Sequence, residues 1–225
     1  NRERTPKMNS NNYIGPARTT TTAVLMSTFN GEKYLQAQIE SILDQLNPDD
    51  ALIIRDDGSS DSTLMIADAY ANKDTRVKVI AGTNLGFANS FFWLLNHIST
   101  DFDVYMLSDQ DDIWLPTKID VANQEVAQET LPTLHCTRLK IVDEKLNPLG
   151  LSPNFSKRPQ LWNALCENIV TGCTAALNKE ALHIICSIPY ETLSKQKLYY
   201  HDWWLYLCLS TFGQVKFDER SNIFY

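Results

Sequence analysis

The stretch with the clearest chemistry is an acidic run at positions 109–112, which directly follows the apolar residues 104–107. The apolar residues are β-branched, aromatic or long aliphatic, as is typical of a short buried strand. That strand must end where the acidic run begins, because ionised carboxylates are costly to bury unpaired. Like charges this close repel, and the spacing of Asp109 and Asp111 directs two carboxylates at one divalent cation. A solvated turn or a helix N-cap is the alternative interpretation.

The residues before this run predict an alternation of strands and helices. Short apolar runs indicate strands at 23–26, 52–54, 77–80 and 104–107. Apolar residues at helical spacing indicate helices at 35–47, 64–70 and 91–98, and Pro116 is expected to open another that reaches Val126. This alternation predicts an α/β fold in which helices sandwich a mixed, mostly parallel sheet.

The pattern changes after Leu131. We predict a strand at 134–142, a turn at 147–150, a small-residue segment at 171–176 before a helix, a helix at 205–212, and final strands at 215–217 and 222–225. Without a linker in the body, residues 23–225 are expected to form a single domain. Residues 1–22 are polar and aperiodic, so we interpret them as a flexible leader or a cloning remnant.

Composition limits the function further. The 225 residues carry a formal net charge of -7, which argues against nucleic-acid binding through a broad basic face. The five cysteines lack metal-site spacing, so we expect reduced, mostly buried thiols and a cytoplasmic protein. We expect no signal peptide and no membrane span, because no apolar run is long enough.

Polar or acidic groups follow three of the predicted strands, at 28–30, at Asp56 and Asp57, and at 109–112. Each group has an ordinary interpretation as a turn or a cap. Ligands of open α/β sheets, however, bind beyond the carboxyl ends of the strands, where these groups would meet. We therefore predict one ligand site at this edge of the sheet.

Five motifs in this order resemble the family 2 glycosyltransferases with the GT-A fold. They are STFNGEKYL at 27–35, IRDDGSSD at 54–61, NLG at 84–86, DQDDIW at 109–114 and HDWW at 201–204. The forms SDQDDIW and HDWW, with NIVTGCT at 168–174, are most similar to those of bacterial rhamnosyltransferases. The resemblance implies an inverting transfer of a sugar, with rhamnose from dTDP-rhamnose favoured, from a nucleoside diphosphate to a hydroxyl of a polysaccharide or lipid-linked glycan.

The same resemblance assigns roles to individual residues. Asp57, with Asp56 as the alternative, would bind the pyrimidine N3–H, and Asp111 would bind Mg²⁺ or Mn²⁺ directly. Asp109 would complete the metal pair or, like Gln110, reach the ribose or donor sugar. Asp202 would be the general base that takes the acceptor proton. The other residues expected around the nucleotide, diphosphate or acceptor are Thr28, Phe29, Asn30, Trp114, Gly172, His201 and Trp203.

Several of these residues have an equally simple structural interpretation. Asp202 could cap the helix that follows it, and His201 could be an ordinary structural histidine. One of Trp203 and Trp204 could belong to the core instead of forming a surface on which the acceptor packs. Trp114 could likewise be a core residue, and Gly172 could be a glycine needed only for packing. Four bases could meet an anionic or lipid-diphosphate acceptor, although scattered surface charges are the simpler account: Lys157, Arg158, Lys195 and Lys197.

Two other functions stay open at this point. A sugar-nucleotide pyrophosphorylase normally has a Gly- and Arg-rich loop after its first strand, whereas residues 27–33 contain one Gly and no Arg. A noncatalytic nucleotide-sugar-binding module would not need Asp109, Asp111 and Asp202 intact. Family members usually continue past the strand that ends at Tyr225, so we expect a C-terminally truncated catalytic domain whose peripheral contact with the inner membrane face runs through the acceptor or the missing segment.

Overall fold

The computed structural model describes residues 18–155, 157–196 and 198–225. Its strands are β1 (Thr22–Thr28), β2 (Ala51–Asp56), β3 (Val77–Ala81), β4 (Val104–Ser108), β5 (Ile113–Trp114), β6 (Thr133–Val142), β7 (Pro148–Leu151), β8 (Ala176–Asn178) and β9 (Gln214–Phe224). Its helices are α1 (Leu35–Leu43), α2 (Thr63–Ala71), α3 (Phe87–His97), α4 (Lys118–Val126), α5 (Leu161–Ala164), α6 (Lys179–Cys186), α7 (Tyr190–Leu193) and α8 (His201–Phe212), with a 3₁₀ turn η1 at Gly172–Thr174.

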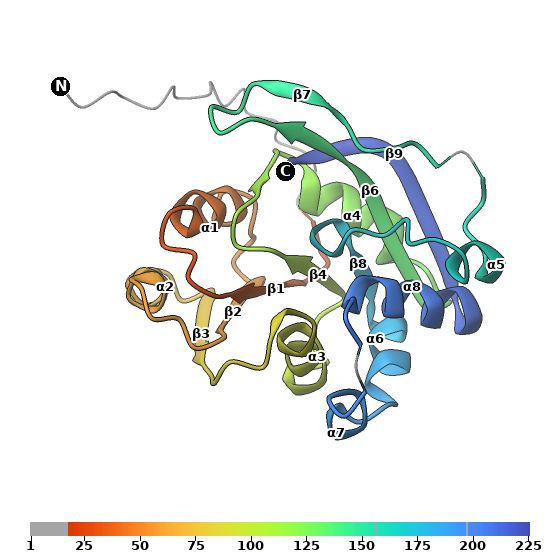
Figure 1. Cartoon of the computed structure of the whole chain (residues 1–225), viewed down its shortest axis with the longest axis horizontal. Helices are drawn as coiled ribbons and strands as arrows, with labels where there is room; N and C mark the ends of the chain where they lie inside the picture. Colours follow the sequence, from red (N-terminus) through yellow and green to blue (C-terminus); the bar gives the residue numbers. More distant parts are fainter. Residues whose placement is uncertain (1–17, 156, 197) are drawn as a thin grey trace.

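Within the described residues the strands form a nine-stranded mixed sheet in the order β3-β2-β1-β4-β8-β6-β9-β5, with β7 paired to β6 (Figure 1). The strands β3, β2, β1 and β4 all run parallel. In register, Thr28 lies beside Asp56, and Met26 lies beside Ser108. The carboxyl ends of β1, β2 and β4 therefore meet at one edge, as the sequence predicted.

The period-two pattern of the first strand divides the core into two layers. Ala23 and Leu25 pack with residues of α3, α5, α6 and α8 on one face of the sheet. Val24 and Met26 pack with residues of α1, α2 and α4 on the other face. Successive strand side chains point to opposite faces, so an uninterrupted apolar strand requires helices on both sides. The predicted α/β sandwich is confirmed.

Three details of the second half differ from the predictions. The two expected final strands are one strand, β9, whose register with β6 shifts near Arg138. The expected turn at 147–150 largely belongs to β7, and the small-residue segment at 171–176 forms η1 and leads into β8. Each difference arises because pairing with β6 or β4 supplies hydrogen bonds that local sequence cannot reveal.

The expected leader and the cysteines can be compared only in part. Residues 1–17 lie outside the described chain, whereas Arg18 pairs with the buried Asp50 and Thr22 begins β1. All five cysteines are free thiols. Cys136 and Cys173 are buried, Cys186 and Cys208 are partly buried and Cys166 is exposed, so the expectation of mostly buried thiols holds only in part. Over the residues that the structure describes, no helix has both the length and the apolar character to cross a bilayer.

Candidate active site

The converging strand ends line a cavity of about 740 Å³. It brings together five residues that the sequence singled out: Phe29, Asp57, Asp109, Gln110 and Asp111. It also contains residues to which the sequence assigned no role: Ser27, Asn84, Gly86, Phe87, Asp112 and Tyr225. The cavity lies where ligands of α/β sheets bind.

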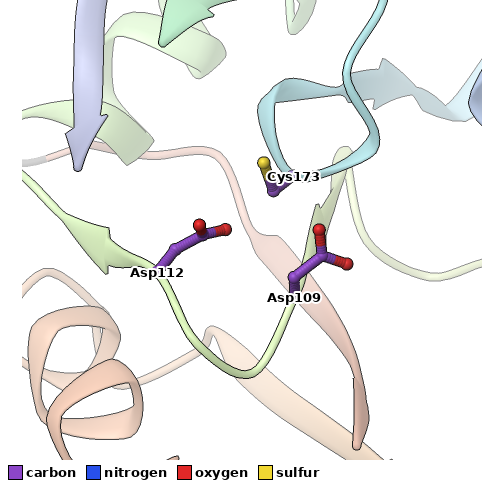
Figure 2. Close-up of side chains that lie close together, drawn as sticks. All are labelled: Asp109, Asp112 and Cys173. Carbon is purple, nitrogen blue, oxygen red and sulfur yellow. The ribbon is translucent and has the colours of Figure 1, made fainter. Parts of the chain in front are cut away.

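The acidic loop after β4 carries two carboxyl groups that lie close to a buried cysteine. The side chains of Asp109 and Asp112 point toward Cys173 of η1 (Figure 2), and ligand atoms of the three residues lie within 4.8 Å of one another. Asp109 Oδ1 and Asp112 Oδ2 are buried and accept no hydrogen bond from the residues that the structure describes. Asp111 is exposed and faces the same cavity.

This environment opposes ionisation of the two carboxyl groups. Burial, together with the charges of Asp112, Asp111 and Asp202, raises the pKa of Asp109 to about 8. Burial, partly offset by the neighbouring Cys173 and reinforced by Asp111, raises the pKa of Asp112 to about 7. The pKa of the Cys173 thiol also rises well above its ordinary value through burial, so this group stays neutral.

These residues fit a hard divalent cation. Carboxylate oxygens are the ligands that Mg²⁺ and Mn²⁺ prefer, and two of them here are buried without a partner. Asp109, Asp111 and Asp112 would hold the ion, whereas the protonated thiol of Cys173 would not ligate it. The sequence overlooked Asp112, although it is the third carboxylate of the run that suggested the site.

The acids after β2 have an opposite environment. Asp57 pairs with the buried Arg55 and accepts hydrogen bonds from the backbone N–H groups of Leu85 (2.8 Å) and Gly86 (2.9 Å). Asp57 nevertheless lines the cavity, so its expected contact with a base N3–H stays a prediction. Arg55 was not singled out, although a base before two acids at a buried strand end is a visible signal of a buried ion pair.

Asp56 lies deeper than Asp57. It is buried and accepts from the Ser59 N–H at 2.9 Å, the Gly58 N–H at 3.2 Å and the Thr28 hydroxyl at 3.3 Å. Thr28 is itself buried, so neither side chain lines the cavity. These contacts give Asp56 and Thr28 a role in fixing the loops beneath the site.

The loop after β1 presents Phe29, whose exposed ring lines the cavity. Asn30 points elsewhere: its Oδ1 accepts the Ser60 N–H at 2.9 Å and joins this loop to the one after β2. The Gln110 amide bonds to the backbone of Phe29, accepting its N–H at 2.8 Å and donating to its carbonyl at 3.1 Å. In this structure the Gln110 amide is therefore directed at the protein backbone.

Asp202 lies near the acids but on a different element. It is the second residue of α8, whose N-cap is Tyr200, so Asp202 is not the N-cap residue, although its Oδ1 accepts the first-turn N–H of Trp203 at 2.6 Å. Asp202 Oδ2 accepts the Gly172 N–H at 3.2 Å, and burial raises the pKa of its carboxyl. Its charge contributes to the raised pKa of Asp109, which places the two carboxylates in one electrostatic neighbourhood.

His201 is buried beside Asp202 rather than open to the cavity. Its ring stacks on Phe91 at 4.2 Å and contacts the edge of Phe87 at 5.0 Å between centroids. Burial lowers its pKa to about 3, so the ring is neutral at physiological pH. A Cβ at Gly172 would lie 2.5 Å from His201 Nε2, so the glycine is required for this packing. These contacts favour the structural interpretation of His201.

The tryptophans and the surface bases also lie away from the cavity lining. Trp203 donates its indole N–H to the Ala164 carbonyl at 2.7 Å, which fastens α8 to α5. Trp114 is 2% exposed and packs in the core layer of α1 and α4. Trp204 meets Phe92 edge-to-face at 5.3 Å. Lys157, Arg158 and Lys195 are exposed, and Lys197 lies outside the described residues.

The fold and this site define a GT-A type domain. The structure resembles TarS of S. aureus, with a TM-score of 0.69 and 18% identity over 91% of this chain and 60% of that chain. It also resembles the mannosyltransferase PcManGT from Pyrobaculum calidifontis, solved with GDP-Man and Mn²⁺, with a TM-score of 0.66 and 16% identity over 93% of this chain and 58% of that one.

The sequence comparisons give the family. The profile of Glycosyl transferase family 2 matches residues 23–185, so the chain belongs to this family of glycosyltransferases. The dTDP-rhamnosyl transferase RfbG of Shigella flexneri is 27% identical over 87% of this chain and 68% of its own length. An uncharacterized glycosyltransferase of Haemophilus influenzae is 30% identical over 64% of this chain, and the match spans only 46% of that relative.

Proposed function

We propose that this chain is a metal-dependent, inverting glycosyltransferase domain that moves rhamnose from dTDP-rhamnose to a hydroxyl of a polysaccharide or lipid-linked glycan. The observation that carries the proposal is the cavity at the strand ends, in which Asp109 and Asp112 hold buried, unpartnered carboxylate oxygens beside the exposed Asp111. Membership of the family supports glycosyl transfer. The choice of rhamnose rests on the similarity to the Shigella dTDP-rhamnosyl transferase.

The donor would occupy the cavity between the β1 loop and the acidic loop. The exposed Phe29 ring offers a stacking face for a pyrimidine base, and Asp57 borders the same space. At about 740 Å³ the cavity is within the range of sites that hold small ligands and cofactors. TarS has been solved with UDP-GlcNAc and PcManGT with GDP-Man, so nucleotide sugars bind to proteins of this fold.

The reaction requires charge neutralisation on one side of the sugar and proton removal on the other. As the anomeric carbon–oxygen bond breaks, its electron pair goes to the leaving diphosphate. A cation held by Asp109, Asp111 and Asp112 would supply electrostatic stabilisation of that charge. The acceptor oxygen bonds to the opposite face of the anomeric carbon, and this attack inverts the configuration of that carbon. The proton of the acceptor hydroxyl passes to an Asp202 carboxylate oxygen.

Asp202 is suited to this task by its surroundings. Burial raises the pKa of its carboxyl, which makes its ionised form a stronger proton acceptor than an ordinary aspartate. The Gly172 N–H bond fixes one oxygen and orients the group. We place the reaction in the cytoplasm, with a lipid-linked acceptor presented at the inner face of the membrane.

Thermal unfolding with nucleotides and Mn²⁺ tests the proposal. Because a ligand that binds only the folded state stabilises it, dTDP at 100 times its Kd should add about 2.7 kcal/mol, or roughly 5–10 °C in Tm. The Asp111→Ala variant should lose the Mn²⁺-dependent part of the shift. The Asp202→Asn variant should keep the shift and lose roughly 10²–10⁴-fold in transfer rate.

The possible outcomes separate the candidate functions. A larger shift with UDP, GDP or CDP than with dTDP would replace rhamnose by another donor. Full transfer activity in both Asp111→Asn and Asp202→Asn would overturn the enzymatic mechanism. Tight nucleotide binding without any transfer, also in a chain extended to the length of its relatives, would establish a noncatalytic binding module instead.

A further inference from the structure

The side chain of Gln110 connects the acidic loop to the loop after β1, both of which line the cavity. Its Oε1 accepts the Phe29 N–H at 2.8 Å, and its Nε2 donates to the Phe29 carbonyl at 3.1 Å. The pair reproduces the reciprocal bonding of two backbone groups in a sheet, but across 81 positions of sequence. Gln110 lies between Asp109 and Asp111 in the acidic loop, whereas Phe29 belongs to the loop after β1.

The β1 loop is shaped to receive this amide. A Cβ at position 31 would lie 2.2 Å from Gln110 Oε1, so Gly31 leaves the space that the Gln110 side chain occupies. On its other side the loop is fixed to the β2 loop, where the Asn30 N–H donates to Ser59 Oγ at 2.9 Å. With that side fixed, Gln110 sets the position of Phe29 relative to the acids.

We propose that Gln110 is a positioning residue that couples the cation site to the nucleoside site through the backbone of Phe29. This inference rests on the proposed function, because it assumes that a cation binds the acids and a base stacks on Phe29. A cation that draws Asp109 and Asp111 together orders the residue between them, and the two amide hydrogen bonds transmit that order to Phe29. By linkage the coupling is reciprocal, so a bound nucleoside raises cation affinity by the same factor.

The test uses thymidine, a ligand without phosphate groups. A diphosphate would contact the cation directly, whereas any effect of a cation on thymidine affinity must pass through the protein. Ligand-detected NMR titrations would give the thymidine Kd with and without saturating Mg²⁺. We expect Mg²⁺ to lower this Kd about fivefold or more in the wild-type chain, and by less than about twofold in Gln110→Ala, where both amide bonds are lost.

A matched control and an independent variant make the test specific. Gln36→Ala removes an exposed glutamine of α1 whose amide bonds only to Glu40, and it should keep the full coupling. Gly31→Ala retains Gln110 but fills its space, so it should lose the coupling as Gln110→Ala does. Unchanged coupling in either cavity variant would overturn the inference.

The same titrations distinguish this inference from the function beneath it. If dTDP with Mg²⁺ does not bind the wild-type chain, the proposed donor site is wrong and the coupling fails with it. If dTDP binds in a Mg²⁺-dependent way while thymidine affinity is indifferent to Mg²⁺, the donor site stands and only the role of Gln110 is refuted. Equal Tm values for Gln110→Ala and Gln36→Ala would show that a loss of coupling is not a loss of folding.

Discussion

The carboxyl ends of β2 and β4 carry similar acids in opposite environments. At the end of β2, Asp57 is buried against Arg55 and accepts two backbone N–H groups. In the loop after β4, Asp112 is equally buried, yet within the described part of the chain its Oδ2 has no hydrogen-bond partner. Both lie in loops that follow parallel strands of one sheet, and both line one cavity, so position in the fold does not explain the difference.

The two ends differ in whether the protein itself supplies a positive charge to its carboxylates. The protein completes the β2 end with its own guanidinium and amide groups, which makes that end a fixed wall of the cavity. It leaves the β4 end with raised carboxyl pKa values and unpartnered oxygens, a costly arrangement that natural proteins keep mainly at functional sites. This difference supports our proposal that the β2 end positions the site and the β4 end binds a cation.

The largest expected effect is at β2. Replacing Arg55 by Met leaves the buried carboxylate of Asp57 without its counter-ion, which should cost about 3–5 kcal/mol of unfolding free energy. Urea unfolding measures this loss. Arg76→Met is the matched control, because Arg76 pairs with Asp74 at a partly exposed position and should cost about 1 kcal/mol or less. Equal losses in the two variants would contradict the view that β2 is completed internally.

Much of this architecture was predictable because local patterns determine it. Short apolar runs located β1 to β4, and the alternation with helices required them to be parallel, which brings their acidic ends together. The single strand β9 was not predictable, because Asp218 and Arg220 interrupt its apolar pattern. Pairing with β6, which shifts register near these residues, carries the strand through them.

The site was predictable in its residue types but not in its contacts. The sequence indicated carboxylates around a cation, but not that Asp112 is buried and Asp109 partly buried while Asp111 remains exposed. Burial depends on how η1 folds over the loop, and Cys173 lies more than sixty positions further along the chain. The indole N–H of Trp203 is likewise anchored by Ala164, a partner that no local pattern reveals.

Neutralising one carboxylate at the β4 end should instead stabilise the protein. Asp109→Asn removes a charge that burial and three neighbouring carboxylates oppose, so the cation-free protein should gain about 1–3 kcal/mol of stability at pH 8. The same variant should lose stabilisation by Mn²⁺. Asp111→Asn is the control, because this exposed residue should leave the cation-free stability within about 0.5 kcal/mol while also weakening Mn²⁺ binding. Destabilisation of the cation-free protein by Asp109→Asn would refute the assignment of an incomplete site.

The buried carboxyl groups after β4 should also give the stability a pH dependence. In the folded, cation-free chain the pKa is about 8 for Asp109 and about 7 for Asp112, against about 4 when unfolded. Between these values the folded state binds more protons, so stability must fall as pH rises. Together these two carboxyl groups should lower the free energy of unfolding by roughly 3–4 kcal/mol from pH 6 to 8. His201, whose lowered pKa acts in the opposite direction, should offset roughly 1 kcal/mol of this loss. Urea unfolding measures the net loss. Asp218 does not obscure it: although burial acts in the opposite direction, the neighbouring His135 ring and hydrogen bonds from Arg220 lower its pKa, so its contribution changes only at more acidic pH. Saturating Mn²⁺ should flatten the dependence of unfolding free energy on pH, because an ion held by the carboxylates keeps them ionised in the folded state. Without metal, Asp109→Asn should reduce the same dependence. A slope unchanged by both would mean that these carboxyl groups do not form one electrostatic site.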